Sequence, residues 1–218
     1  MYLINAIYFK GAWRDGFDSK RTASGMFTTH TGQQVSARFM TRKGGFRAGM
    51  VGNTQVVELP YGGDAYVMTI ALPAEGTPIN ALVAGLSPAY WQSLTGSIPS
   101  ASSSFELHLP KFTLSWEDTL NDELKTLGMR KAFMPGVADF SRLSRSQAIH
   151  LYISEVKQKT FVDVNEEGTE AAAVTSVAID VVSLPPSIRL DRPFVFAIRE
   201  RLTGTVVFLG KIVRPTSA

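Results

Sequence analysis

The arrangement of apolar, small and polar residues between positions 164 and 186 stands out from the rest of the chain. This stretch reads VNEEGTEAAAVTSVAIDVVSLPP. Between residues 169 and 182 the odd-numbered positions carry no charge, and the even-numbered positions hold both acidic residues. Such a period of two is typical of a strand with one buried face. The first half is nevertheless rich in alanine, a poor strand former, and Gly168 and a double proline bracket the stretch as they would a loop.

A helix is the competing interpretation of the same stretch. Acidic residues followed by alanines favour the first turn of a helix. The later positions become β-branched, however, and no apolar stripe with the helical period of about 3.6 residues continues through them. From the residues alone, helix and strand are equally favoured here.

Strands are predicted along most of the remaining chain from apolar runs and from alternating segments bounded by turn residues. The expected strands cover residues 1–9, 66–72, 105–114, 155–164, 188–190, 194–199 and 205–213. Several short alternating runs between residues 26 and 72 are separated by glycine-containing turns, which predicts antiparallel sheet. Leu202, Thr203 and Gly204 are expected to form the turn of the last hairpin.

Two helices are predicted between these strands. Residues 79–98 carry an apolar stripe at helical spacing, formed by Leu82, Leu86, Tyr90 and Leu94. The second helix is expected to start at Ser115 as N-cap, with Asp118 three residues on, and to stop at Gly128. Its buried stripe would consist of Leu120, Leu124 and Leu127. Many strands with few helices predict an α+β fold dominated by antiparallel sheets.

The composition of the 218 residues is that of an ordinary globular protein, with 44% hydrophobic and 19% charged residues. This length supports one good core, and the polar segment at residues 99–104 is too short for a domain linker, so we expect one domain over residues 1–218. The chain has no cysteine, which excludes disulfides and cysteine-ligated metals. The net charge of +3 is spread thinly, and no apolar run approaches the roughly 20 residues that span a membrane. We therefore expect neither a nucleic-acid partner nor a membrane.

An enzyme is not expected from the motifs of this chain. His30, His108 and His150 are isolated from one another, and none has the spacing of a metal ligand beside a carboxylate. The sequence lacks a G-x-S-x-G elbow, a phosphate-binding loop and a G-x-G-x-x-G fingerprint. We accordingly expect no catalytic residue, no bound metal and no cofactor.

Short motifs along the chain resemble those of the serpin family. The most specific is the run EEGTEAAA at residues 166–173, which is similar to the hinge of a serpin reactive-centre loop. Further similar motifs follow the family's order: NAIYFKG at 5–11, ELPY at 58–61, LP at 72–73, PKF at 110–112, ADFS at 138–141, RPF at 192–194 and FLG at 208–210. Each motif alone is weak, but their order and spacing together make the match specific over nearly the whole chain.

The resemblance implies that the protein is a suicide inhibitor of proteases. In a serpin the protease cleaves the exposed loop and is held as an acyl-enzyme, and the freed loop inserts as a new strand into the main sheet. Such loop insertion is a well-known example of strand addition and of released strain. The hinge implied here consists of Glu166, Glu167, Gly168, Thr169, Glu170, Ala171, Ala172 and Ala173.

The same resemblance places the cleaved bond between Val182 and Ser183, counting from the hinge glycine as the family does. A branched aliphatic residue at Val182 suits the small hydrophobic pocket of an elastase-like serine protease, with chymotrypsin-like enzymes as related targets. Other aliphatic residues close by would shift this register if they were cleaved instead: Ile179, Val181 and Leu184. Papain-like cysteine proteases are the second class of partner that the family takes.

Three further residues are implied to control the opening of the main sheet. Asn5 and Trp13 lie in motifs that the family uses in this way, although both are also ordinary packing residues. Gln158 stands where the family commonly has a histidine, and glutamine keeps the hydrogen bonds but does not change its charge near neutral pH. Lys111 in the PKF motif is read only as an edge charge.

A serpin carries a long, mostly helical N-terminal part before the strand at residues 1–9. The resemblance therefore implies that this chain is the C-terminal portion of the fold, with the N-terminal helical part absent. Any export signal would lie in that part, and none is present at Met1. The family implies an extracellular location and a monomeric full-length protein.

Two alternatives stay open at this point. One is a non-inhibitory serpin with a chaperone, carrier or storage role, and the other is an inactive fragment. The hinge is small, free of proline and uncharged on its insertion face, which favours an inhibitor over a non-inhibitory serpin.

Overall fold

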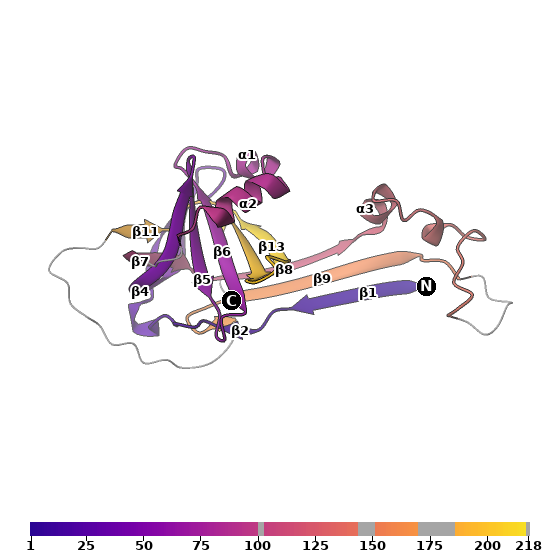
Figure 1. The fold of residues 1–218 in the computed structure, drawn as a ribbon, viewed down its shortest axis with the longest axis horizontal. Coiled ribbons are helices and arrows are strands. Elements are labelled where there is room, and N and C mark those ends of the chain that lie inside the picture. Colours follow the sequence, from indigo (N-terminus) through magenta and orange to yellow (C-terminus); the bar gives the residue numbers. More distant parts are fainter. Residues whose placement is uncertain (100–102, 144–150, 170–185, 217–218) are drawn as a thin grey trace. The chain divides into compact units, whose positions relative to one another are not determined.

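A computed structural model of the chain describes residues 1–99, 103–143, 151–169 and 186–216. Strands dominate these residues, and the helices are few and short (Figure 1). The chain divides into two compact units, one formed by Met1–Phe9 and Leu114–Val162 and the other by Lys10–Thr113 and Asp163–Ala218. No helix in the described ranges is long and apolar enough to cross a membrane.

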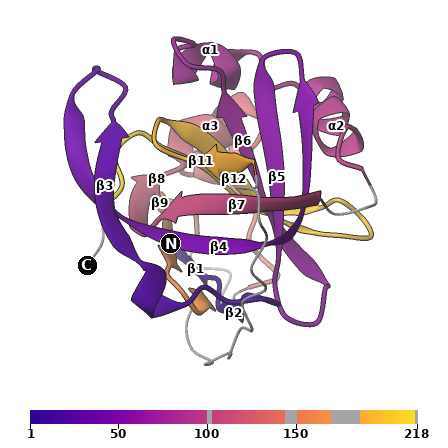
Figure 2. The ribbon, with the colours of Figure 1, turned by 90° about the vertical axis from the view of Figure 1, so that its left-hand side faces the viewer.

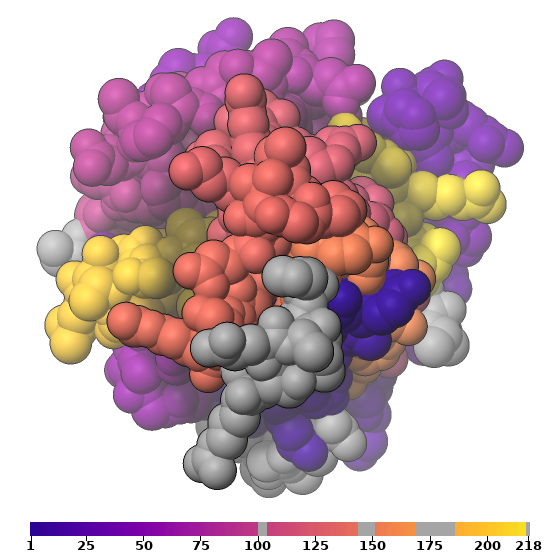
Figure 3. Space-filling view, turned by 90° about the vertical axis from the view of Figure 1, so that its right-hand side faces the viewer, coloured from indigo at the N-terminus to yellow at the C-terminus, as the bar shows by residue number. Residues whose placement is uncertain are grey.

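The first unit is built on a three-stranded sheet of order β1-β9-β8. β1 (Tyr2–Tyr8) and β9 (Glu155–Val164) run parallel and side by side, which confirms the strands predicted at both places (Figure 1). Most side chains of β1 are exposed, and the space-filling view shows the start of β1 at the surface beside β9 (Figure 3). β1 and β9 are hydrogen-bonded directly to each other along the whole of β1, so no strand separates them.

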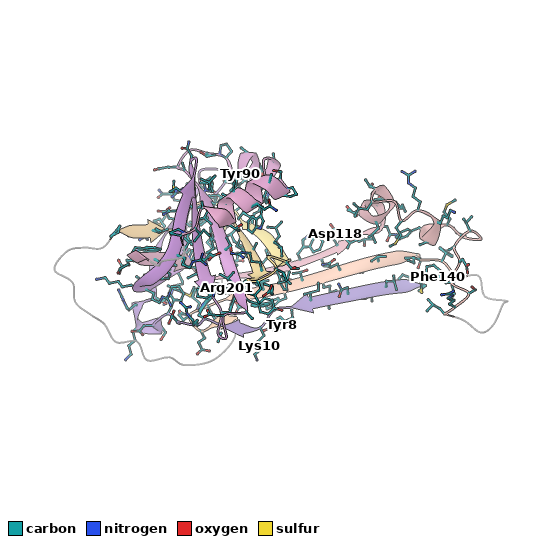
Figure 4. All side chains as sticks on the ribbon, in the orientation of Figure 1. Tyr8, Lys10, Tyr90, Asp118, Phe140 and Arg201 are labelled. Carbon is teal, nitrogen blue, oxygen red and sulfur yellow. The ribbon has the colours of Figure 1, made fainter. Side chains whose placement is uncertain are left out.

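The helix predicted to start at Ser115 is wrong, because β8 (Phe112–Thr119) continues through that position. Asp118 lies on this strand rather than in a helical turn (Figure 4). The carboxylate of Glu117 lies close to two lysines of the neighbouring strand β9, a cross-strand attraction that favours the extended form. The helix begins only at α3 (Asn121–Thr126), after the strand has ended.

The predicted apolar stripe of this helix is also wrong. α3 has no buried residue, and Leu127 is 83% exposed. The predicted stop is confirmed, since Gly128 follows the helix with a φ of +105°, a backbone conformation that favours glycine. A short 3₁₀ turn, η2 (Lys131–Phe133), comes next.

The second unit contains an eight-stranded sheet of order β11-β7-β4-β5-β6-β12-β13, with β3 added beside β4. Its strands are β3 (Ala23–Thr28), β4 (Gln34–Val51), β5 (Thr54–Pro60), β6 (Tyr66–Pro73), β7 (Ser103–Pro110), β11 (Ser187–Arg189), β12 (Phe194–Glu200) and β13 (Val206–Ile212). All pairs in this sheet are antiparallel except β11 with β7; Figure 2 shows β4, β7 and β11 next to one another. The strand predicted over residues 105–114 is divided between β7 and β8.

These elements form the predicted α+β architecture, in which antiparallel pairs dominate. β9 and β11, which lie on either side of residues 170–185 in the sequence, belong to different sheets. The hairpin turn predicted before β13 is present, because the Gly204 N–H donates to the carbonyl of Glu200 at 3.0 Å. The parallel pairing of β1 with β9 and of β7 with β11 was not predicted, since parallel neighbours are joined by long connections that leave no local signal.

The single helix predicted over residues 79–98 is divided into α1 (Ile79–Ala84) and α2 (Pro88–Gly96). Proline cannot continue a helix, and Ser87 caps α2 instead by accepting the Tyr90 N–H at 3.2 Å. The apolar stripe itself is confirmed in part, because both helices contribute to a buried cluster beneath them. The cluster consists of Val56, Ala71, Ile79, Leu82, Leu94, Ile98 and Val195, with Leu86 and Tyr90 packed at its border.

Candidate functional site: the hinge after strand β9

β9 ends in a tight turn that reverses the chain at residues 165–168. The Asn165 N–H donates to the carbonyl of Gly168 at 3.0 Å, and the Gly168 N–H donates to the carbonyl of Asn165 at 3.2 Å. Gly168 has a φ of +125°, where an L side chain is strained. A Cβ atom at this position would also lie only 2.6 Å from the backbone nitrogen of Trp13. The turn therefore requires glycine at Gly168.

The strand that leaves the turn is β10 (Gly168–Thr169), and it pairs antiparallel with β2 (Gly11–Ala12). Gly168 lies opposite Ala12 and Thr169 opposite Gly11. The Thr169 side chain is not described. The other predicted hinge and cleavage residues lie outside the described ranges: Glu170, Ala171, Ala172, Ala173, Val182 and Ser183.

The segment after residues 170–185 is anchored on the edge of the eight-stranded sheet. The Glu106 N–H of β7 donates to the carbonyl of Pro186 at 3.0 Å, and β11 then pairs with β7 over three residues. β2 and β7 therefore hold the two ends of the predicted reactive loop, and both belong to the second unit.

Trp13 is brought directly against the hinge turn. Its indole is 3% exposed, stacks on Tyr61 with ring centroids 4.6 Å apart, and meets Phe17 edge-on. Its Nε1–H donates to the carbonyl of Asn165 at 3.0 Å, and its backbone N–H donates to the carbonyl of Glu167 at 2.9 Å. Trp13 thus supports the turn through both its ring and its backbone.

Glu166 is the charged centre of the turn. Its carboxylate lies 2.8 Å from Lys111 Nζ and accepts the Thr22 hydroxyl at 2.7 Å. Burial opposes ionisation of this group, but the hydrogen bonds from Lys111 and Thr22 outweigh that effect and hold the pKa of Glu166 below its ordinary value. From the sequence, Lys111 was interpreted as an edge charge, and Thr22 was not singled out. The residues around them do not indicate which distant side chain each one contacts.

Asn5 and Gln158 are brought together away from the hinge, within the first unit. They are register partners across the parallel pair of β1 and β9. Asn5 is exposed, and Gln158 is half-buried. The structure therefore joins two of the three residues predicted to control sheet opening, and it places Trp13 with the hinge turn instead.

The described contacts around the hinge turn fix the position of the backbone and do not surround a chemically reactive side chain. Within the described ranges, no three His, Asp or Glu residues lie close enough to hold a metal ion. Backbone hydrogen bonds tie the turn to the segment of Trp13, and an ion pair and a hydroxyl hold its acidic residue. These contacts fix the turn from which β10 runs onto β2.

Comparison with known proteins agrees with this geometry. The family model described as "Serpin (serine protease inhibitor)" matches residues 1–215. Glia-derived nexin from Rattus norvegicus is 35% identical over 222 residues, which cover 99% of this chain and 55% of that protein. Plasminogen activator inhibitor 1 from Neovison vison is 36% identical over 221 residues, covering 99% of this chain and 54% of that protein.

The fold is similar to that of solved structures as well. The crystal structure of native protease nexin-1 with heparin superposes with a TM-score of 0.83 at 31% identity, covering 98% of this chain and 57% of that chain. The chain spans about half the length of the curated relatives that it matches. The family model matches nearly every residue of this chain. The motif of the hinge also forms a turn in this structure, with Gly168 at its end and β10 paired with β2. The chain belongs to the serpin family.

Proposed function

We propose that the full-length protein containing this chain inhibits serine proteases by the suicide mechanism of its family. A protease cleaves the loop formed by residues 170–185 and is held as an acyl-enzyme. The part of the loop that follows Gly168 then inserts between β1 and β9. Family membership supports the inhibitory activity, and the geometry of the hinge supports the insertion.

The observation that carries this proposal is the turn at residues 165–168. It reverses the chain after β9, so a strand that follows it runs antiparallel to β9. β1 is parallel to β9, and the same strand would therefore be antiparallel to β1 as well. Insertion would then exchange one parallel pair for two antiparallel pairs, and about a dozen new backbone hydrogen bonds at about 1 kcal/mol each would favour it.

The composition of the inserted segment suits this step. Residues 171–173 are alanines, which are small enough to enter a sheet without forcing its strands far apart. The odd-numbered positions that would face the interior carry no charge, so their burial adds to the driving force. A charged or proline-containing hinge would oppose insertion, which is why we favour an inhibitor over a non-inhibitory serpin.

The partner that we propose is an elastase-like serine protease acting in the extracellular space, which cleaves between Val182 and Ser183. Support comes from the branched aliphatic side chain of Val182, since a trypsin-like enzyme would require Arg or Lys there. Papain-like cysteine proteases remain the second class of target. The full-length inhibitor is proposed to be a monomer.

The test uses the full-length protein mixed separately with pancreatic elastase, trypsin and papain. We expect a complex with elastase that survives denaturing electrophoresis, and mass spectrometry should place the cut after Val182. Trypsin is the matched control, because no Arg or Lys lies between residues 170 and 185. Cleavage of the loop without a stable complex for any of the three enzymes would support the non-inhibitory alternative.

A further inference from the structure

A chain of side-chain hydrogen bonds leads from β8 into the hinge turn. The Thr113 hydroxyl donates to Asp163 Oδ1 at 2.7 Å, and Asn165 Nδ2 donates to Asp163 Oδ2 at 3.1 Å. The Glu167 backbone N–H then donates to Asn165 Oδ1 at 3.0 Å. Each oxygen of the carboxylate and each end of the amide thus has one partner, and Asp163 accepts from both sides, from Thr113 and from Asn165. Asp163 and Asn165 are both half-buried.

The contacts of the turn fall into two groups during insertion. The pairing of β10 with β2 has to break, because the amides of β10 must face new strands. The side-chain hydrogen bonds of Asp163 and Asn165 join Thr113 of β8, the end of β9 and the turn, and none of them goes to β2 or β10. This second group can stay formed while β10 exchanges its partners.

We propose that Asp163 and Asn165 are positioning residues that keep the hinge turn formed throughout insertion. The inference rests on the proposed function, since it concerns the step in which the cleaved loop enters the sheet. With the turn preserved, the loop begins insertion as a hairpin on β9. If the turn loosened, its residues would have to become ordered again before the loop could insert, and this would slow insertion. Slower insertion gives water more time to hydrolyse the acyl-enzyme. Asp163 acts on the turn through Asn165, and neither residue touches the protease.

The direction of the hydrogen bonds allows a test with isosteric substitutions in the full-length protein. In Asp163→Asn, the new amide can still accept from Asn165 through its oxygen while its NH₂ donates to the Thr113 hydroxyl, so this variant should stay close to the wild type. In Asn165→Asp, two carboxylates face each other. In the double variant Asp163→Asn with Asn165→Asp, residue 163 donates to residue 165, and every position of the chain has a partner again. Asp118→Asn, an identical change at an exposed position of β8, serves as the matched control.

Two measurements are made on each variant. The first is the number of inhibitor molecules consumed per molecule of elastase trapped, together with the rate of the first cleavage. The second is hydrogen exchange of the Glu167 amide in the uncleaved protein. For Asn165→Asp we expect insertion to be about five times slower, as for the loss of one hydrogen bond, and therefore more inhibitor to be consumed, with an unchanged rate of first cleavage and faster exchange at Glu167. Asp163→Asn should give values close to those of the wild type. The double variant should return both values to those of the wild type.

The outcomes separate this inference from the function on which it rests. Wild-type protein that traps elastase, with an Asn165→Asp variant that traps it equally well, overturns the positioning role alone. A double variant as defective as Asn165→Asp overturns it too, because restoring the hydrogen bond between residues 163 and 165 should restore insertion if that bond positions the turn. Wild-type protein that forms no complex overturns the proposed function and the role in insertion together.

Discussion

Glu166 shows how a single residue of the hinge depends on partners far away in the sequence. Lys111 and Thr22 reach its carboxylate from two other segments, and together they outweigh the cost of burying the charge. The motif that contains Glu166 was visible in the sequence, and Gly168 marked the start of a loop-like stretch there. The identity of its partners was not visible, because a lysine in a short motif looks the same whether it faces water or a carboxylate.

The ion pair of Lys111 should stabilise the native protein only while Glu166 is charged. The folded-state pKa of Glu166 is lowered, so its contribution is complete above the unfolded-state pKa of about 4.3 and is lost as the pH falls through the folded value. We expect Lys111→Met to reduce the free energy of unfolding by about 1 kcal/mol at pH 7, since the pair is partly exposed. Urea denaturation of the full-length protein from pH 7 to pH 3.5 would measure this. A difference from wild type that stayed constant over the range would contradict the assignment.

Thr169 is predicted from the parity of its position to lead the loop into the sheet with its side chain on the buried face. Thr169→Arg would place an unpaired charge there, at a cost of several kcal/mol if it is fully buried. Insertion should slow, and the protein should become a substrate of elastase rather than an inhibitor. Gel analysis would then show mostly cleaved protein and active protease. Glu170→Arg is the control, because that side chain would stay on the solvent face, and equal trapping by the Thr169 variant would refute the parity.

At the scale of elements, β11 is the shortest strand of the large sheet and lies at its edge. It has three residues and, within the part of the chain that the structure describes, pairs only with β7. His108 of β7 is the register partner of both Thr41 on β4 and Arg189 on β11, and its Nδ1 lies 3.1 Å from the Thr41 hydroxyl. Its Nε2 lies 3.4 Å from a carboxylate oxygen of Glu106. The anchor of β11 therefore contains a titratable group.

Protonation of His108 should loosen this anchor. Burial lowers the pKa of His108 below its ordinary value, with the charges of Arg189 and Arg21 acting in the same direction and Glu106 opposing them. The native state therefore prefers the neutral ring. Its contribution to stability is complete above the unfolded-state pKa of about 6.5 and declines as the pH falls from there toward the folded value.

Hydrogen exchange of the β7 and β11 amides at pH 7.5 and pH 5.5, corrected for the intrinsic effect of pH, would measure this loosening. We expect lower protection at pH 5.5 in the wild type and no such change in His108→Gln, which keeps a hydrogen-bonding side chain but does not titrate. Equal protection of the wild type at both values would show that the charge of His108 has no influence on β11.

The elements also show where local patterns mislead. Apolar spacing over residues 79–98 predicted one helix, and the stripe is present, but Pro88 starts a second helix because it cannot continue the first. The capping pattern at Ser115 predicted a helix that is not there, because β8 gains a whole row of hydrogen bonds by extending beside β9. A pairing with a distant strand overrode a local preference.

At the scale of the whole molecule, a buried charge network joins distant strands of the large sheet. Glu58 of β5 is 2% exposed and receives Arg47 Nη1 at 2.6 Å and Arg199 from β12. Arg199 also donates to the Thr69 hydroxyl of β6 at 3.0 Å. A buried carboxylate with two guanidinium partners leaves no charge uncompensated, which is the condition under which such a group is tolerated.

Removing the charge of Glu58 should therefore destabilise the entire sheet. We expect Glu58→Gln to lower the free energy of unfolding by about 3 kcal/mol, because two arginines lose their counter-charge in a buried site. Asp64→Asn is the control, since that carboxylate pairs with Arg14 and Arg201 at the surface and its loss should cost less than about 1 kcal/mol. Urea denaturation of both variants would compare them, and equal losses would show that burial of Glu58 has no energetic consequence.

The sequence by itself determined the features of this protein that depend on neighbouring residues. Alternation and apolar runs predicted β6, β9, β12 and β13 with nearly the observed bounds, and the glycine expected to stop the second helix, Gly128, does follow α3. The order of the short motifs was sufficient to indicate the family, because each motif consists of neighbouring residues that can be recognised without knowing the fold.

The tertiary structure alone decided which of these pieces meet. Trp13 and Asn165 are 152 residues apart in the sequence, yet the Trp13 indole donates a hydrogen bond to the Asn165 carbonyl at the hinge. The parallel pairing of β1 with β9, the partners of Glu166 and the hydrogen bond of Asp163 with Thr113 likewise join segments that lie at least 50 residues apart in the sequence. Such contacts depend on the register of strands that only the folded sheets define, since hydrogen bonds between strands carry no signature in either strand taken alone.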